Sequence, residues 1–222
     1  MKSSGARPPS PAGPGLVCFA LPQEAGAFQQ RVAGRADLAI LITGIGRQNS
    51  ERRLLERWPP LPPRFVLTCG FAGGLDPALA PGDVLCATED AGWRGRLTAA
   101  GAKPVKFFCA TRIATTREEK QELRRATGAD AVEMESEAIQ ALCRERGIPC
   151  ATVRVISDSA NEDLPLDFNQ LSKPDLSLDY GKLLWAIAKS PGKIPGLLHL
   201  QKNSSLAARR LADVLATVTR LD

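Results

Sequence analysis

The first 160 residues alternate short apolar runs with amphipathic stretches. The apolar runs are nearly continuous, which is typical of strands covered on both faces. They predict strands at residues 16–21, 38–43, 64–69, 84–88, 105–109 and 150–156. Helical periodicity predicts helices at 48–58, 117–126 and 133–146, the last ending at a Gly-Ile-Pro stop. This order predicts an α/β fold: a single domain with a central mixed, twisted sheet flanked by helices.

The pattern changes at both ends of this region. After residue 158, a loop-like stretch at 161–174 precedes predicted helices at 177–189 and 204–221, which are separated by a double Pro-Gly break at 190–196. Residues 1–15 are rich in Pro, Gly, Ser and Ala and lack the apolar stretch of a signal peptide. We therefore expect a disordered tail at 1–15 and one domain at 16–222.

Composition narrows the class of protein. A chain of 222 residues with 44% hydrophobic residues is long enough for one full α/β core. Its longest apolar runs fall short of the roughly 20 residues of a membrane-spanning helix. The net charge is +5, and residues 171–222 hold eight Lys/Arg against four Asp. Basic residues are not interleaved with aromatics, so we expect no nucleic-acid partner.

Cysteine and histidine usage restricts the chemistry. The six cysteines form no CxxC pair and mostly lie in apolar runs, which favours reduced core thiols in a cytoplasmic protein. His199 is the single histidine, so a His-based metal cluster or a Ser-His-Asp triad is not expected. We expect neither a metal nor an organic cofactor.

Two glycine-rich turns follow predicted strands. Residues 70–75 read Gly-Phe-Ala-Gly-Gly-Leu, and their glycines would let backbone amides approach the oxygens of a sugar or phosphate. A tight strand-to-loop turn explains the same residues equally well. The second turn, Thr-Gly-Ile-Gly at 43–46, precedes a helix and is a weaker signal.

Several acidic residues also fall near strand ends. Glu133 and Glu135 flank Met134 at a predicted helix start, where carboxylates also favour the helix dipole. Asp158 is equally suited to an N-cap, and Glu24 to a first helical turn. These local explanations leave open why all of them share the sheet edge where α/β proteins bind ligands. A carboxylate beside a thioether suits a ribose, and an Asp past a strand end suits protonation of a purine.

Four motifs in this order resemble the nucleoside phosphorylase and nucleosidase superfamily. They are Cys-Gly-Phe-Ala-Gly-Gly-Leu at 69–75, Pro-Gly-Asp-Val at 81–84, Val-Glu-Met-Glu at 132–135 and Val-Arg-Val-Ile-Ser-Asp at 153–158. The resemblance covers about residues 16–160 and is nearest to 5′-methylthioadenosine/S-adenosylhomocysteine nucleosidases. The tail after residue 158 is more similar to hopanoid-biosynthesis-associated nucleoside phosphorylase-like proteins. The resemblance implies a nucleoside phosphorylase-like fold and a role in nucleoside metabolism.

The resemblance also implies residue roles. Asp158 matches the general acid that protonates purine N7, and Ser157 the residue that orients it. Glu135 matches the carboxylate that binds the ribose hydroxyls, and Met134 packs on the sugar. Glu24 matches the acid that positions and deprotonates water. The remaining expected substrate contacts are Glu133, Phe71, Ala72, Gly73 and Ile113, the last where the family holds adenine through the backbone.

Departures from the family pattern bear on the nucleophile. Phosphorylases of this superfamily bind phosphate with an Arg and a Ser where this chain has Thr68 and Phe71. Without that positive charge and hydroxyl, water is favoured over phosphate as the nucleophile, which indicates a hydrolase. Arg47 or Arg154 could supply the missing positive charge, so a phosphorylase remains an alternative. Nucleosidases also usually keep a Ser at 71, and the aromatic expected near Arg112 is missing, which keeps a non-catalytic nucleoside-binding protein open.

The sequence says least about the group that the substrate carries at its 5′ position. The segment 90–103 is short and Gly-rich compared with the family, which implies an open 5′ side suited to a bulky or lipidic group such as that of adenosylhopane. The resemblance also implies a homodimer. The apolar stretches 183–187 and 194–200 carry flanking lysines that suit peripheral contact with an anionic membrane. Packing on the body or on a second subunit is the favoured alternative.

Overall fold

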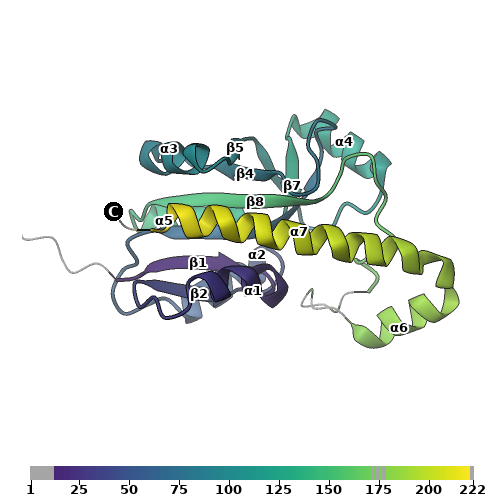
Figure 1. Ribbon diagram of the computed structural model, residues 1–222, viewed down its shortest axis with the longest axis horizontal. Coiled ribbons are helices and arrows are strands. Elements are labelled where there is room, and N and C mark those ends of the chain that lie inside the picture. The colour runs from purple at the N-terminus through teal and green to yellow at the C-terminus, as the bar shows by residue number, and fades with distance from the viewer. Residues whose placement is uncertain (1–12, 172, 174–175, 177–178, 221–222) are drawn as a thin grey trace, which may run out of the picture.

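The computed structural model describes residues 13–171, 173, 176 and 179–220 (Figure 1). Most of the expected tail, residues 1–12, and the first residues of the helix expected at 177–189 lie outside this range. The end of the expected tail is part of the fold. Gly13 forms a parallel bridge with Pro63, and the first strand begins at Gly15.

The described residues form one mixed sheet. Its strands are β1 (Gly15–Phe19), β2 (Leu38–Ile42), β3 (Val66–Gly74), β4 (Val84–Ala87), β5 (Lys103–Pro104), β6 (Phe107–Cys109), β7 (Ala131–Glu133) and β8 (Cys150–Asp158). The order is β2-β1-β3-β8-β4-β5, and β7 joins the end of β3 to β6. Strand β1 runs parallel to β2 and β3, and β3 runs parallel to β8. The pairs β4–β8 and β3–β7 are antiparallel, which confirms the predicted mixed sheet.

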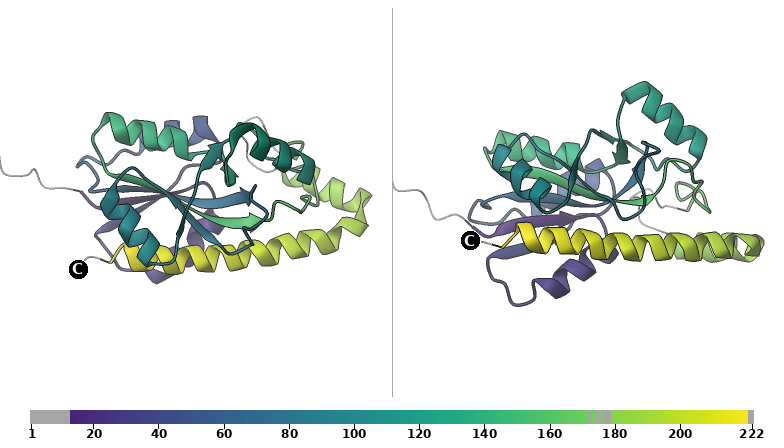
Figure 2. Two further views of the ribbon diagram at one scale, coloured as in Figure 1. Left: turned by 90° about the horizontal axis from the view of Figure 1, so that it is seen from above. Right: turned by 45° about the horizontal axis from the view of Figure 1, so that its top comes forward.

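Helices cover both faces of the sheet (Figures 1 and 2). They are α1 (Pro22–Arg31), α2 (Arg47–Glu56), α3 (Ala91–Ala99), α4 (Arg117–Thr127), α5 (Ser136–Glu145), α6 (Tyr180–Lys189) and α7 (Ile194–Val218). Helices α1 and α7 share an apolar cluster on one face, and α2 and α5 share a cluster on the other. The flanked-sheet prediction is therefore confirmed.

Alternation along β1 explains the two layers. Val17 and Phe19 point into the cluster that contains Leu211 of α7. Leu16 and Cys18, one residue out of phase, point into the cluster with α2 and α5. Because successive strand residues face opposite sides, a run that is apolar throughout must be covered twice.

Two local predictions were wrong. Glu133 ends strand β7, and α5 begins only at Ser136, rather than the helix starting at 133. Within the Gly-rich segment 90–103, for which no element was predicted, Ala91–Ala99 forms helix α3, which Asp90 caps by accepting from the Trp93 amide. The break at 190–196 is shorter than expected. Only Pro191–Lys193 interrupts the helices, since Pro195 lies in the first turn of α7, where proline costs no hydrogen bond.

The central pair of strands positions the site. Strands β3 and β8 are nine residues long and run side by side, with Phe71 opposite Val155 and Gly73 opposite Asp158. The register shifts just after Ala72, so both strands end irregularly at the same edge. Within the described residues, no helix has the length and apolarity required to cross a membrane.

Candidate functional site

A cavity of about 240 Å³ opens at the carboxyl edge of β1, β3 and β8. All ten sequence-predicted site residues line it: Asp158, Glu24, Glu135, Met134, Glu133, Ser157, Phe71, Ala72, Gly73 and Ile113. The lining also includes residues not singled out from the sequence as site residues, namely Ile45, Leu164, Phe168, Leu200 and Ser204. Ile45 belongs to the weaker glycine turn, and the other four come from the tail after β8.

Asp158 is held at the end of β8 from two sides. The Ser157 hydroxyl donates to Asp158 Oδ1 at 2.7 Å. The Lys120 ammonium lies 2.5 Å from Asp158 Oδ2 and donates to the carbonyls of Ser159 and Glu162 at 2.8 and 2.9 Å. The ammonium hydrogen-bonds to the two carbonyls, whereas Oδ2 is buried and is paired with it by charge alone. The ion pair and the Ser157 hydroxyl therefore fix the position of the Asp158 carboxyl group.

Lys120 is a site residue that sequence reasoning missed. It lies in the highly charged helix α4, whose pattern is typical of a solvated face. Nevertheless its side chain is 0% exposed. Its ammonium donates to two carbonyls of the segment after β8 and pairs by charge with Asp158, so it fixes that segment as well as Asp158.

We expect Lys120→Met to destabilise the protein by about 3 kcal/mol, because it leaves a buried carboxylate without its charge partner. Urea unfolding at constant pH measures this change. The matched control is Arg125→Met on the same helix, where the side chain is 73% exposed and the effect should stay within about 0.5 kcal/mol. Equal midpoints for the two variants would show that the buried pair contributes nothing.

A second buried cation organises the carboxylates beside the glycine turn. Arg154 is 1% exposed and places Nη2 2.6 Å from Glu133 Oε2 and 3.1 Å from Glu135 Oε2. Its Nη1 donates to the Cys69 carbonyl. A Cβ at Gly70 would lie 2.6 Å from Arg154 Nη1 and 2.7 Å from Glu24 Oε1. Glycine is therefore required at 70 by the close approach of these charges.

Glu133 and Glu135 have different surroundings. Glu133 accepts from the amides of Glu135 and Ser136 and from the Ser136 hydroxyl. Burial opposes ionisation of Glu133, but Arg154 and these hydrogen bonds outweigh it and lower its pKa. This geometry favours a supporting role for Glu133 rather than direct contact with a ligand. Its assignment as a substrate contact stays a prediction.

Glu135 is the freer of the two carboxylates. Its Oε1 accepts from the Gly46 amide at 2.8 Å, and burial, partly offset by Arg154, raises its pKa. Gly46 has a φ of +88°, which glycine adopts without strain. The weaker of the two glycine turns therefore forms part of the site, because it orients this carboxylate.

Glu24 lies across the cavity, in the first turn of α1. Its two oxygens accept from the amides of Leu21 and Phe71, each at 2.8 Å. Burial is the main cause that raises the pKa of Glu24, to about 7, while Arg154 opposes it. A carboxyl that titrates near neutral pH is suited to accept a proton during a reaction.

The backbone amide and carbonyl of Ile113 are both hydrogen-bonded to the side chain of Asn169. Its amide donates to Asn169 Oδ1 and its carbonyl accepts from Asn169 Nδ2, both at 2.9 Å. The Asn169 carboxamide thus pairs with both polar groups of this residue. The Ile113 amide, which has a single hydrogen to donate, is therefore not open to a ligand unless Asn169 moves.

Comparisons with known proteins agree with this architecture. The family model described as "Phosphorylase superfamily" matches residues 106–187. A 5′-methylthioadenosine/S-adenosylhomocysteine nucleosidase of Anoxybacillus flavithermus is 28% identical over 182 residues, covering 65% of this chain and 77% of the relative. An aminodeoxyfutalosine nucleosidase of Campylobacter jejuni is 26% identical over 167 residues, covering 60% and 73%. The chain is therefore similar to proteins of the phosphorylase superfamily, and the family model covers its residues 106–187.

Solved structures of other proteins have the same fold. The futalosine hydrolase of Helicobacter pylori superposes with a TM-score of 0.69 at 15% identity, covering 93% of this chain and 97% of that one. The Helicobacter pylori 5′-methylthioadenosine/S-adenosylhomocysteine nucleosidase gives a TM-score of 0.67 at 17% identity, with 94% and 98% covered. The predicted nucleoside phosphorylase-like fold is confirmed.

The cavity is lined by more negative than positive side chains. Four acidic residues line it, against the single basic residue Arg112 among the described lining residues. Arg112 is itself paired with Glu119 at 2.7 Å. Such a lining favours a ligand that develops positive charge and disfavours a phosphate dianion.

The alternative phosphate-binding cations are engaged elsewhere. Arg47 pairs with Glu137, both more than half exposed, and does not line the cavity. Arg154 is paired with two glutamates, and Thr68 accepts from it at 3.3 Å. The six cysteines are free thiols. Within the described part of the chain, no group of three or more His, Cys, Asp or Glu side chains is placed to hold a metal ion.

Proposed function

We propose that this protein is a nucleosidase that cleaves the N-glycosidic bond of a 5′-substituted adenosine and releases adenine. One observation carries the proposal: a serine-oriented Asp158 shares one acid-lined cavity with Glu24 and Glu135. The names of the relatives, which are adenine-nucleoside nucleosidases, support the same reaction class.

Asp158 is the proposed general acid. A purine is a poor leaving group until N7 is protonated, so a positioned carboxyl lowers the barrier to its departure. The Ser157 hydroxyl fixes Oδ1, and Lys120 fixes the carboxylate through Oδ2. In the reacting complex Asp158 acts in its protonated form: its proton moves to N7 as the bond between N9 and C1′ breaks and the bonding electron pair leaves with the purine.

The ribose is held by Glu135 and Met134. The Glu135 carboxylate, oriented by the Gly46 amide and Arg154, accepts from the sugar hydroxyls. Met134 is 8% exposed in the cavity wall and offers an apolar surface to the sugar. As the purine leaves, positive charge develops on the ribose, and the acidic lining stabilises it.

Water is the proposed nucleophile and Glu24 its base. The Phe71 and Leu21 amides hold the Glu24 carboxylate, and its pKa near 7 allows it to take the proton as water adds to C1′. Phosphate is disfavoured because Arg47 and Arg154 are engaged elsewhere. A phosphorylase and a non-catalytic nucleoside-binding protein are the alternatives that experiment separates.

The 5′ substituent is proposed to be apolar. Leu164, Phe168 and Leu200 of the tail after β8 line the cavity together with Leu21. An apolar rim of this kind suits an alkyl or lipidic group better than an amino-acid side chain. A lipid-linked adenosine of the hopanoid type falls within this class.

We also propose a cytoplasmic homodimer with peripheral membrane contact. The free, mostly buried thiols support a reducing compartment. The dimer is implied by the resemblance to the nucleosidase family. Exposed apolar and cationic side chains on α6 and α7 support the membrane contact.

The proposal is tested with a substrate panel. Adenine release is measured from 5′-methylthioadenosine, S-adenosylhomocysteine, adenosine and a 5′-alkylthioadenosine of increasing chain length. We expect release from the 5′-alkylthio compounds with KM falling as the chain lengthens. Binding of all four without release would instead identify a nucleoside-binding protein.

The Asn169 carboxamide makes a further prediction for this function. If adenine uses the Ile113 backbone, Asn169 must first leave it, and breaking those hydrogen bonds weakens binding. We expect Asn169→Ala to lower KM by about threefold to tenfold, equivalent to about one net hydrogen bond, with kcat little changed. Gln170→Ala, next to it and exposed, is the control. A raised KM would show that Asn169 itself holds the substrate.

A further inference from the structure

Helix α7 has two unlike halves. Its C-terminal half is buried against the sheet through Ala207, Leu211 and Leu215. Its N-terminal half extends past the sheet and leads, through the turn Pro191–Lys193, to α6 (Figures 1 and 2). We call residues 180–206 the arm. The arm therefore forms a helical projection beside the cavity rather than part of the core.

The arm exposes large apolar side chains. Leu184, Trp185 and Leu198 are 68%, 63% and 60% exposed. On α7, Ile194, Leu198 and Lys202 follow at intervals of four, so they share one helix face. Exposed apolar side chains gathered in this way mark an interaction surface more often than single ones do.

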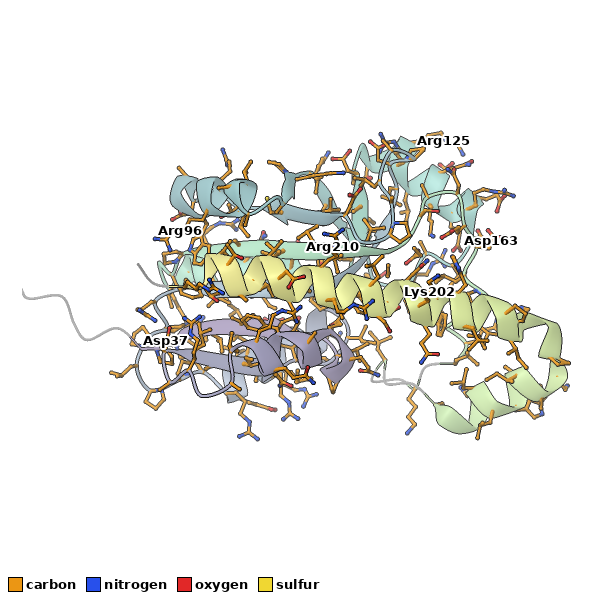
Figure 3. All side chains as sticks on the ribbon, viewed as in Figure 1. Asp37, Arg96, Arg125, Asp163, Lys202 and Arg210 are labelled. Carbon is orange, nitrogen blue, oxygen red and sulfur yellow. The ribbon has the colours of Figure 1, made fainter. Side chains whose placement is uncertain are left out.

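The charge of this region has one sign. Residues 180–212 contain no Asp or Glu and six basic residues: Lys182, Lys189, Lys193, Lys202, Arg209 and Arg210. Lys189 Nζ lies 3.9 Å from the centre of the Trp185 ring. Figure 3 shows Lys202 and Arg210 along α7. Tryptophan beside lysine, with apolar neighbours, suits the boundary between lipid headgroups and acyl chains.

We propose that the arm docks on an anionic membrane surface. A second copy of this chain is a poorer occupant. A twofold contact of arm on arm would face two acid-free, cationic segments toward each other. Anionic lipids complement that charge, and the bilayer accommodates Leu184, Trp185 and Leu198.

The same helix that carries this surface also lines the cavity. Leu200 and Ser204 line it from the face of α7 opposite to Leu198 and Lys202, which face outward. Docking through the outward face therefore holds the cavity behind α7, next to the membrane. Resting on the proposed nucleosidase function, this predicts faster turnover of a substrate whose apolar 5′ group is held in the same membrane.

Vesicle cosedimentation of the full chain tests the docking. The vesicles are phosphatidylcholine alone, or phosphatidylcholine with one quarter phosphatidylglycerol. The arm variant is Trp185→Ser/Lys189→Glu/Lys193→Glu. The control, Arg96→Glu/Arg125→Glu, reverses two exposed charges on α3 and α4, which lie away from α6 in Figure 3. We expect wild type and control to bind only the anionic vesicles, and the arm variant to bind at least about tenfold more weakly.

Two results would overturn the docking: no binding of wild type to anionic vesicles, or equal binding of the arm variant and the control. Size-exclusion chromatography identifies the other occupant. A wild-type oligomer that the arm variant loses, without vesicle binding, would mean that the arm is an interface between copies.

Activity separates this inference from the proposed function. Wild type and arm variant should release adenine equally from dissolved 5′-methylthioadenosine. From a 5′-octadecylthioadenosine held in anionic vesicles, the arm variant should be slower by at least about tenfold. Normal release from the soluble substrate without vesicle binding would refute the docking alone. Vesicle binding without release from any substrate would refute the nucleosidase and leave the docking standing.

Discussion

Asp158→Asn is expected to lower kcat by about a hundredfold to ten-thousandfold, the range that a general acid supplies. The asparagine keeps the shape of the side chain and can still accept at one atom, but it cannot deliver a proton to the purine. Since Ser157 and Lys120 remain to orient it, nucleoside binding should change only a few-fold. Fixed-time assays of adenine release measure kcat, and calorimetric titration with 5′-methylthioadenosine measures binding.

The control for this variant is Asp163→Asn. Asp163 is exposed, accepts from the Arg117 amide and does not line the cavity. It lies in the same segment after β8, so it reports whether any nearby loss of charge slows turnover. Comparable kcat values for the two variants would remove Asp158 from the reaction. Loss of both binding and turnover only in Asp158→Asn would indicate a damaged cavity instead of a missing acid.

Glu24→Gln is expected to lower kcat by about a hundredfold and to abolish the acid limb of the pH profile. The base must be ionised to accept the proton from water. Burial raises the pKa of Glu24 to about 7, so the ionised fraction falls as the pH drops through that value. For wild type, kcat/KM should therefore rise with pH and level off above about 7, with about a tenfold fall per pH unit well below it.

The matched control is Glu51→Gln, which changes an exposed glutamate on α2. It should keep both the rate and the acid limb. A Glu24→Gln variant that retained the wild-type limb would assign the titration to another group. A limb displaced to the ordinary glutamate range, near pH 4.5, would mean that water reaches Glu24 in solution.

The strands were predictable because strands buried on both faces appear in the sequence as short apolar runs. Runs such as 38–42 are apolar at every position, and strands covered on both faces explain such runs. The ends were less accurate, since the carboxyl end of β8 includes Ser157 and Asp158, which are polar. These residues stay in the strand because the β3 register holds them there.

Site residues that carry acidic groups at strand ends were predictable from the sequence. Residues that reach the site only through tertiary packing were not. Glu24, Glu135 and Asp158 stand out as acids at strand ends, and they do line one cavity. The sequence did not indicate Lys120, because a lysine in a highly charged helix is expected to be solvent-exposed. Its burial depends on the segment after β8, whose carbonyls accept from its ammonium. Likewise, the Asn169 contact with Ile113 spans 56 residues and depends on loop geometry that no local pattern encodes.

The measurement closest to the central claim is product analysis in ¹⁸O-labelled water with purified protein and 5′-methylthioadenosine, with and without phosphate. The account predicts adenine and a methylthioribose carrying one ¹⁸O at C1, formed at the same rate in both conditions. Adenine release that requires phosphate and yields a ribose 1-phosphate without ¹⁸O would contradict it.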